Sequence, residues 1–265
     1  MQHTDQIQAL SEFLLEYATT LMGAGVHTNR AVRNISRIAA AYGYSADMTI
    51  FQRNITMSLI CKDDETLRRT SVRKLKPLAF NLNLIQQLSE LSWLPVDNNV
   101  SIAEMEQAFR SIVRTKRFSR WTDLLLVSVG NAAFCRLFNG DLWAMLTMTP
   151  YFLLAGAATL LGFLVKQQLS RLKYNPLGVI ILSAFAASMA AACAVIFQLG
   201  STPQIALATS VLFLVPGVQM INSIMDLMHG HILMGISRGV HSIMMISCIT
   251  IGLSATMLIV GVNSL

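Results

Sequence analysis

The second half of this chain lacks charge. Residues 123–265 contain only five of the 20 lysines and arginines and three of the 14 aspartates and glutamates. Soluble domains usually have about 25% charged residues, whereas this chain has 13% overall and 54% hydrophobic residues. We therefore predict a soluble domain over residues 1–122 and a helical membrane domain over residues 123–265.

Several common motifs are also missing. No basic segment followed by an apolar segment opens the chain, so no cleavable signal peptide is expected. No CxxC pair occurs, and the isolated cysteines indicate small buried hydrophobic residues rather than a disulfide or zinc framework: Cys61, Cys135, Cys193 and Cys248. Without a GxGxxG, P-loop or HExxH motif, we predict no catalytic site, metal site or cofactor, and no enzymatic activity.

The net charge of +6 has two readings. A basic protein can bind nucleic acid, but the basic residues here gather where the apolar segments begin, as in the run Arg110, Arg114, Lys116, Arg117 and Arg120 beside Trp121. This placement favours a cytoplasmic face against the anionic headgroups of a lipid bilayer, and no nucleic acid is expected.

Residues 1–122 have the spacing of a small α+β domain. Apolar residues recur at helical intervals over 6–22, from Thr28 (the expected N-cap) to Gly43, over 82–91 and over 101–114, where Ser101 and Glu104 form a capping-box pattern. Residues 48–51 and 55–60 predict two strands, and 66–72 fit a third. The acidic run 63–65 could hold a metal, but a solvated hairpin turn is the simpler interpretation.

Five apolar segments predict membrane spans over residues 123–138, 142–165, 177–199, 205–225 and 240–262. Lysines and arginines occur in the loop 166–173 but not in 138–141 or 200–204. The positive-inside rule then places the N-terminus and residues 226–239 in the cytoplasm and the C-terminus outside.

The fourth predicted span is interrupted at Pro216 and Gly217. Such breaks occur in ordinary kinked helices, and also in the discontinuous helices with which transporters bind substrates. Asn222, Asp226 and Gly230 follow at intervals of four, so we expect them to share one helix face.

Asp226 admits several roles at the cytoplasmic end of this span. Its carboxylate could bind a substrate ammonium, accept a proton or pair with Arg238, or it could simply reach water. Histidine ordinarily titrates near neutral pH, so His229 and His231 could serve proton coupling. Gly235 and Gly239 permit close helix packing, and Arg136, near the outer end of the first span, fits no loop and suggests a function.

These residues carry a resemblance to a known family. Leu214-Val215-Pro216-Gly217 with Asn222, Asp226, Gly230-His231 and Arg238 resembles the signature of the threonine/serine exporter family. The stretch from Leu21 to Gly43, with Gly25, Thr28 and Arg30, resembles the cytoplasmic domain of that family, and Asn139-Gly140-Asp141 with Trp143 resembles its first extracytoplasmic turn.

The resemblance implies a multi-pass protein of the bacterial inner membrane, so the C-terminus that loop charge places outside would be periplasmic. Full-length exporters of this family carry about five further spans. Because only five spans are predicted here, the chain is similar to the larger subunit of the split form, like the enteric inner-membrane pair linked to succinate export. A small membrane-protein partner is then expected to supply the second transmembrane half.

The likeness to the split pair favours a dicarboxylate as the substrate, with threonine or serine as the alternative. A dicarboxylate such as succinate would use Arg136 and Arg238, whereas threonine or serine would also need Asp226. The proton gradient is the expected energy source, and a non-transporting assembly or sensory subunit is the alternative of another class. The predicted pathway consists of Arg136, Asp141, Pro216, Gly217, Asn222, Asp226, His231 and Arg238.

Overall fold

The computed structural model describes residues 2–51, 53–75, 80–98, 100–114, 119–138, 148–172, 174–197 and 203–261. Contacts between residues divide the chain into two compact units. The first consists of Met1–Lys116 together with Gly217–Val240, and the second of Arg117–Pro216 together with His241–Leu265. A segment from the second half of the sequence therefore packs with the N-terminal domain. The predicted boundary between residues 122 and 123 separates a water-soluble part of the sequence from a membrane part, not two packing units. It stays a prediction.

The first unit contains one small antiparallel sheet. Its strands lie in the order β1 (Tyr44–Ile50), β2 (Asn54–Cys61) and β3 (Arg68–Lys74). Alternate residues of β2 are fully buried, namely Ile55, Met57 and Leu59, because successive side chains of a strand point to opposite faces. The two predicted strands are confirmed and extended, and the third is present.

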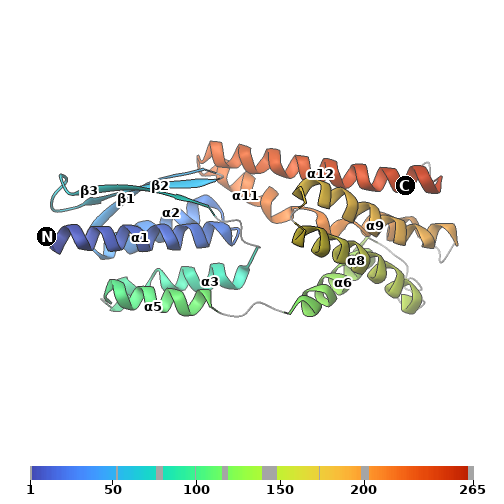
Figure 1. Ribbon diagram of the computed structural model, residues 1–265, viewed down its shortest axis with the longest axis horizontal. Coiled ribbons are helices and arrows are strands. Elements are labelled where there is room, and N and C mark those ends of the chain that lie inside the picture. The colour runs from blue at the N-terminus through green and yellow to red at the C-terminus, as the bar shows by residue number, and fades with distance from the viewer. Residues whose placement is uncertain are drawn as a thin grey trace. The chain divides into compact units, whose positions relative to one another are not determined.

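Helices cover one face of this sheet in two layers (Figure 1). The first layer is α1 (Gln2–Gly23) and α2 (Thr28–Ala41), and the second contains α3 (Leu82–Leu91), α4 (Leu94–Asn98) and α5 (Ile102–Val113). Tyr17 of α1 lies in the core between the layers, where its hydroxyl donates to Leu88 O at 2.6 Å. The helical spacing of apolar residues therefore predicted these buried faces correctly.

The N-caps predicted at Ser101 and Thr28 can be compared with the observed helix starts. Ser101 and Glu104 form the expected capping box, with Glu104 N donating to Ser101 Oγ at 3.3 Å and Ser101 N donating to Glu104 Oε2 at 2.8 Å. The N-cap predicted at Thr28 is wrong. Thr28 is already helical, and His27 caps α2 by accepting from Arg30 N at 3.3 Å.

The second unit is helical throughout its described part. Its elements are α6 (Arg120–Leu137), α8 (Met148–Arg171), α9 (Pro176–Ile196), α10 (Pro203–Thr209), η1 (Leu212–Leu214) and most of α12 (Ile232–Val260). One buried amide joins three of them, since Asn131 Nδ2 of α6 donates to Thr159 Oγ1 of α8 at 2.8 Å and to Thr209 O of α10 at 3.0 Å. A side-chain amide in an apolar bundle is stable only when its hydrogen bonds are made in this way.

Small residues bring α9 and α12 close together. A Cβ on Gly252 would lie 2.6 Å from Ile181 O and 2.8 Å from the Cβ of Ala184. Next to this contact, the hydroxyls of Ser188 and Thr256 lie 2.6 Å apart. Packing through small residues and interhelical hydroxyl bonds is typical of helices that associate within a bilayer.

Two described helices are long and apolar enough to cross a membrane: α9 over Pro176–Cys193, and α12 over Ile232–Val260. A third span is counted if the helical segments before and after Pro216 act as one. The predicted five spans are therefore confirmed only in part. The start of the second predicted span, at residue 142, lies outside the described residues.

We predict that Gly252→Ala destabilises the second unit by about 1–3 kcal/mol, because the added methyl group overpacks the contact with α9. Gly178→Ala is the matched control. Its Cβ meets nothing within 4 Å, and alanine favours a helix over glycine by up to about 1 kcal/mol. Thermal unfolding of both variants in one detergent checks this, and equal melting temperatures would contradict the packing argument.

Candidate functional site

The site begins at the loop between α1 and α2. Gly25 has φ +94°, a left-handed conformation that favours glycine, and a Cβ there would lie 2.6 Å from the ring of Phe80. Asn81 N donates to Ala24 O at 3.1 Å and fixes the loop on the domain. The carbonyls of Gly25 and Val26 are thereby presented to other elements.

The partner of this loop is α11 (Gly217–Met228). The helix begins after Pro216, whose preceding residue Val215 is extended, as residues before proline usually are. It ends in a Schellman motif, in which His231 N donates to Asp226 O at 2.8 Å and Gly230 N donates to Leu227 O at 3.1 Å. The prediction that Gly230 continues the helical face is therefore wrong, because its φ of +80° ends the helix.

The polar side of α11 faces inward. Ser223 and Asp226 are buried, whereas Ile221, Ile224 and Met228 are 63%, 59% and 76% exposed. A surface helix of a soluble protein shows the opposite pattern. This arrangement is typical of a helix whose outer side contacts lipid or another apolar surface.

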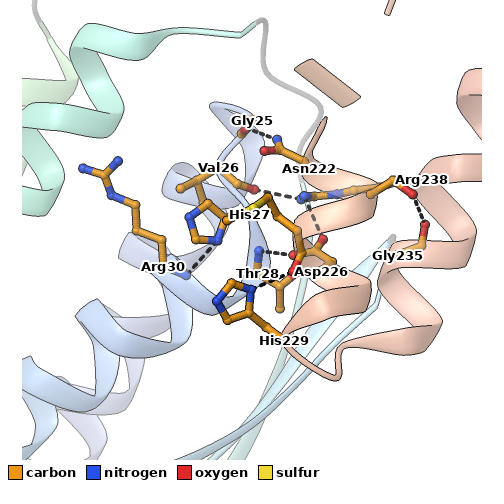
Figure 2. Close-up of polar contacts among 12 residues, drawn as sticks. Gly25, Val26, His27, Thr28, Arg30, Asn222, Asp226, His229, Gly235 and Arg238 are labelled. Carbon is orange, nitrogen blue, oxygen red and sulfur yellow. Dashed lines mark hydrogen bonds and ion pairs between the residues drawn. The ribbon is translucent and has the colours of Figure 1, made fainter. Parts of the chain in front are cut away.

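Three polar side chains join α11 and the following helix, α12, to the loop between α1 and α2 (Figure 2). Asn222 Nδ2 donates to Gly25 O at 2.7 Å, Arg238 Nη2 of α12 donates to Val26 O at 2.9 Å, and Thr28 N donates to Asp226 Oδ1 at 2.7 Å. We call these side chains, with the backbone of residues 25–28, the polar junction.

An ion pair lies at the centre of the polar junction. Arg238 Nη1 is 2.9 Å from Asp226 Oδ2, and the two side chains are 11% and 0% exposed. Asp226 also accepts from the first residue of α2, where the positive end of the helix dipole stabilises an anion. Of the roles predicted for Asp226, the pairing with Arg238 is confirmed and simple exposure to water is wrong.

Two histidines lie beside the ion pair. The rings of His27 and His229 are stacked, with centroids 6.1 Å apart and planes 16° from parallel. His229 Nδ1 lies 2.7 Å from Met225 O and donates to it, since a carbonyl can only accept. His27 Nδ1 accepts from Arg30 N, so this nitrogen carries no proton while it caps α2.

The environment keeps His27 neutral. Burial, the largest cause, lowers its pKa below the usual 6.5, and the charges of His229, Arg30 and Arg33 add to this effect. The Asp226 carboxylate acts in the opposite direction but is outweighed. The cap and the lowered pKa therefore favour the same protonation state.

Two glycines let α12 approach α11. A Cβ on Gly235 would lie 2.7 Å from Leu227 Cγ, and one on Gly239 would lie 2.9 Å from Ser223 Oγ. Ser223 Oγ also donates to Gly235 O at 2.7 Å. The close approach places Arg238 within reach of Asp226.

The structure brings together only some of the predicted pathway residues. Asn222, Asp226 and Arg238 meet in the polar junction, with Gly235 and Gly239 beside them. Pro216 lies in the helix break, Gly217 begins α11, and His231 follows its end. Arg136 belongs to α6 of the other compact unit, and Asp141 lies outside the described residues.

Sequence reasoning missed the loop side of the junction. Gly25 and Thr28 were noted as features of the cytoplasmic domain, with no connection to Asp226. Thr28 and Asp226 are separated by 198 residues, and neither periodicity nor spacing indicates such a pairing. The available signal was local, namely a glycine next to a helix start, which marks an N-terminus able to receive an anion.

Comparison with known proteins places the whole junction inside one matched region. The family described as "Putative threonine/serine exporter" matches residues 12–260. The "Probable succinate transporter subunit YjjP" of Escherichia coli (strain K12) is 28% identical over 238 residues, or 89% of this chain and 88% of the relative. Its namesake from Klebsiella aerogenes is 26% identical over 253 residues, or 94% of each chain. No solved structure matches the chain significantly.

We predict that Asp226→Asn lowers the free energy of unfolding of the first unit by about 3–5 kcal/mol, because it leaves the buried Arg238 guanidinium without a counter-charge. Adding Arg238→Met should recover part of this loss. Asp97→Asn, at an exposed position of the same unit, is the control and should change stability by less than about 0.5 kcal/mol. Thermal unfolding measures the loss of stability, and hydrogen exchange of the Thr28 amide reports on its bond to Asp226. An unchanged exchange rate in Asp226→Asn would contradict the prediction.

Stability should also fall on acidification through His27. Its pKa is lower in the folded than in the unfolded protein, so the unfolded state binds more protons below about pH 6.5, and protonation favours unfolding. His27→Asn keeps a capping acceptor but does not titrate. We expect the melting temperature to drop less between pH 7.5 and 5.5 in this variant than in the wild type; identical drops would exclude His27 as the cause.

Proposed function

Because the chain belongs to the threonine/serine exporter family, we propose that it is one subunit of a two-component exporter of small carboxylates, with a dicarboxylate such as succinate as substrate. The observation that carries this proposal is the likeness to two relatives named as succinate transporter subunits, over 88% and 94% of their lengths. Both names describe transport rather than catalysis, in agreement with the absence of catalytic motifs in the sequence.

The second component is a membrane protein. The relatives are named as subunits, which implies a partner, and we propose a small protein that supplies further membrane helices. The outward apolar residues of α11 and α12 offer surface for such helices as well as for lipid.

We further propose the bacterial inner membrane, with the N-terminus in the cytoplasm and the C-terminus in the periplasm. The basic loop around residues 166–173 supports this orientation. The place of residues 226–239, between the fourth and fifth predicted spans, within the N-terminal unit also supports it, because this segment and the N-terminal domain must then lie on the same side of the membrane. Five spans would satisfy these conditions.

The polar junction would act as the coupling element of transport. Both oxygens of Asp226 are engaged, one by Thr28 N and one by Arg238, so neither residue can bind substrate or exchange a proton unless the junction opens. Opening would free the carboxylate of Asp226, near the C-terminal end of α11, and the guanidinium of Arg238 on α12. We propose that the proton gradient supplies the energy for this opening.

Threonine or serine is the second candidate substrate, favoured by the description of the family. An amino acid would place its ammonium on Asp226 and its carboxylate on Arg238 in the open junction. A dicarboxylate would place one of its carboxylates on Arg238.

Export from whole cells tests these proposals. Cells expressing the chain alone, or with its membrane partner, are loaded with labelled succinate and labelled threonine. We expect succinate efflux only when both proteins are present. Threonine efflux would instead support the second candidate, and no efflux of either compound despite correct insertion would support an assembly or sensory subunit.

In the same assay, we expect Asp226→Asn to reduce efflux at least about tenfold per inserted molecule, since the junction loses the charge that holds Arg238. Asp97→Asn should leave efflux unchanged. Efflux that persists in the Asp226 variant at normal protein levels would remove the polar junction from the mechanism.

A further inference from the structure

We propose that the N-terminal domain carries a binding site for a small, multiply charged anion on the face of α2 formed by Arg30, Arg33 and Arg37. Residues at these intervals share one side of a helix. The site is separate from the polar junction, and the inference does not rest on which substrate is exported.

These arginines have no carboxylate partner among the described residues. The ion pairs of arginines there are Arg73 with Glu16, Arg110 with Glu106 and Arg238 with Asp226. Arginine side chains at half-buried positions usually pair with an acid, because an uncompensated charge is costly away from water. Arg30 and Arg37 are half-buried without such an acid, and the exposed Arg33 lies between them. The compensation is therefore left to a ligand.

Two of the guanidinium groups are held in place by neutral partners. Arg30 Nε donates to Ser89 Oγ at 3.0 Å, and Arg37 Nη1 donates to Ser92 Oγ at 2.5 Å. Both serine hydroxyls donate to backbone carbonyls, at 2.6 Å each, so they present lone pairs to the arginines. The Arg37 guanidinium also lies 3.6 Å from the ring centre of Trp93. Each hydrogen bond holds a guanidinium group in place without neutralising its charge. The other N–H donors of the same group remain for a ligand.

The local electrostatics favour an anion. Burial and the neighbouring Arg33 charge lower the pKa of Arg37, which shows that the charged form is disfavoured there. The other titratable group that faces Arg37 is the Tyr17 hydroxyl, and burial raises the pKa of that group, so it is neutral. Arg30 lies in the first turn of α2, where the helix dipole adds positive potential.

The ligand class follows from the donor set. Guanidinium forks bind carboxylates and phosphates with two parallel hydrogen bonds. The three arginines rise about 10 Å along the helix from first to last, which suits an ion with two or three charged groups rather than a single carboxylate. A free carboxylate or phosphate metabolite and the phosphate of a lipid headgroup share this chemistry.

Calorimetric titration of the full-length protein in nanodiscs tests the site, with citrate and inorganic phosphate as probes. Arg33 is the most exposed of the three and makes no bond that α2 needs, so Arg33→Gln should fold normally. We expect it to weaken citrate binding about tenfold or more, and Arg37→Gln to do the same. Arg68→Gln removes the same charge from an exposed position on β3 and should bind citrate like the wild type.

The lipid composition separates the two sources. If a headgroup occupies the site, anionic phosphatidylglycerol nanodiscs should weaken citrate binding relative to phosphatidylcholine nanodiscs in the wild type but not in Arg33→Gln. If a free metabolite occupies it, citrate should bind equally in both. The proposal is overturned if the wild type binds neither probe at millimolar concentration in phosphatidylcholine, or if Arg33→Gln and Arg68→Gln weaken binding equally.

Discussion

The buried charges of Asp226 and Arg238 are stable only as an ion pair, and the arrangement of the residues around them follows from this constraint. A charge removed from water is stable only with an opposite charge and with its remaining hydrogen bonds made. Here Thr28 N completes the carboxylate, and Val26 O accepts from the guanidinium. The loop between α1 and α2 therefore has to present a free N–H and a free carbonyl at one place, which the left-handed Gly25 allows.

The same constraint explains why the polar side of α11 is buried and its apolar side is exposed. Its polar side chains are used against the N-terminal domain, so apolar residues are left to face outward, where an apolar partner or lipid can receive them. Met234, in the first turn of α12, extends the contact, because its side chain joins the hydrophobic core of the N-terminal domain. A helix that enters a membrane thus starts inside the core of a domain with the composition of a soluble protein.

Local patterns predicted local structure well. Helical periodicity located the buried faces of α1, α2 and α3, and the capping box at Ser101 marked the start of α5 correctly, because each depends on residues a few positions apart. Gly230 was misassigned although a glycine after the last periodic residue is an ordinary helix-end signal. The polar junction could not be predicted, since periodicity shows which residues share a face but not what that face contacts. The polar residues in an apolar segment suggested a substrate path, which stays a prediction, and periodicity gave no sign that Asn222, Asp226 and Arg238 also contact a distant loop.

The 198 residues between Thr28 and Asp226 also set an order of assembly. Ribosomes add about 5–20 residues per second, so the loop is synthesised roughly 10–40 s before the carboxylate that binds it. The N-terminal domain has its sheet and five of its helices by then and can be complete except for this one docking surface. Docking of α11 thus has to wait until four described helices of the second unit, α6, α8, α9 and α10, have been synthesised. An intact junction would therefore mark a chain whose synthesis has passed Arg238.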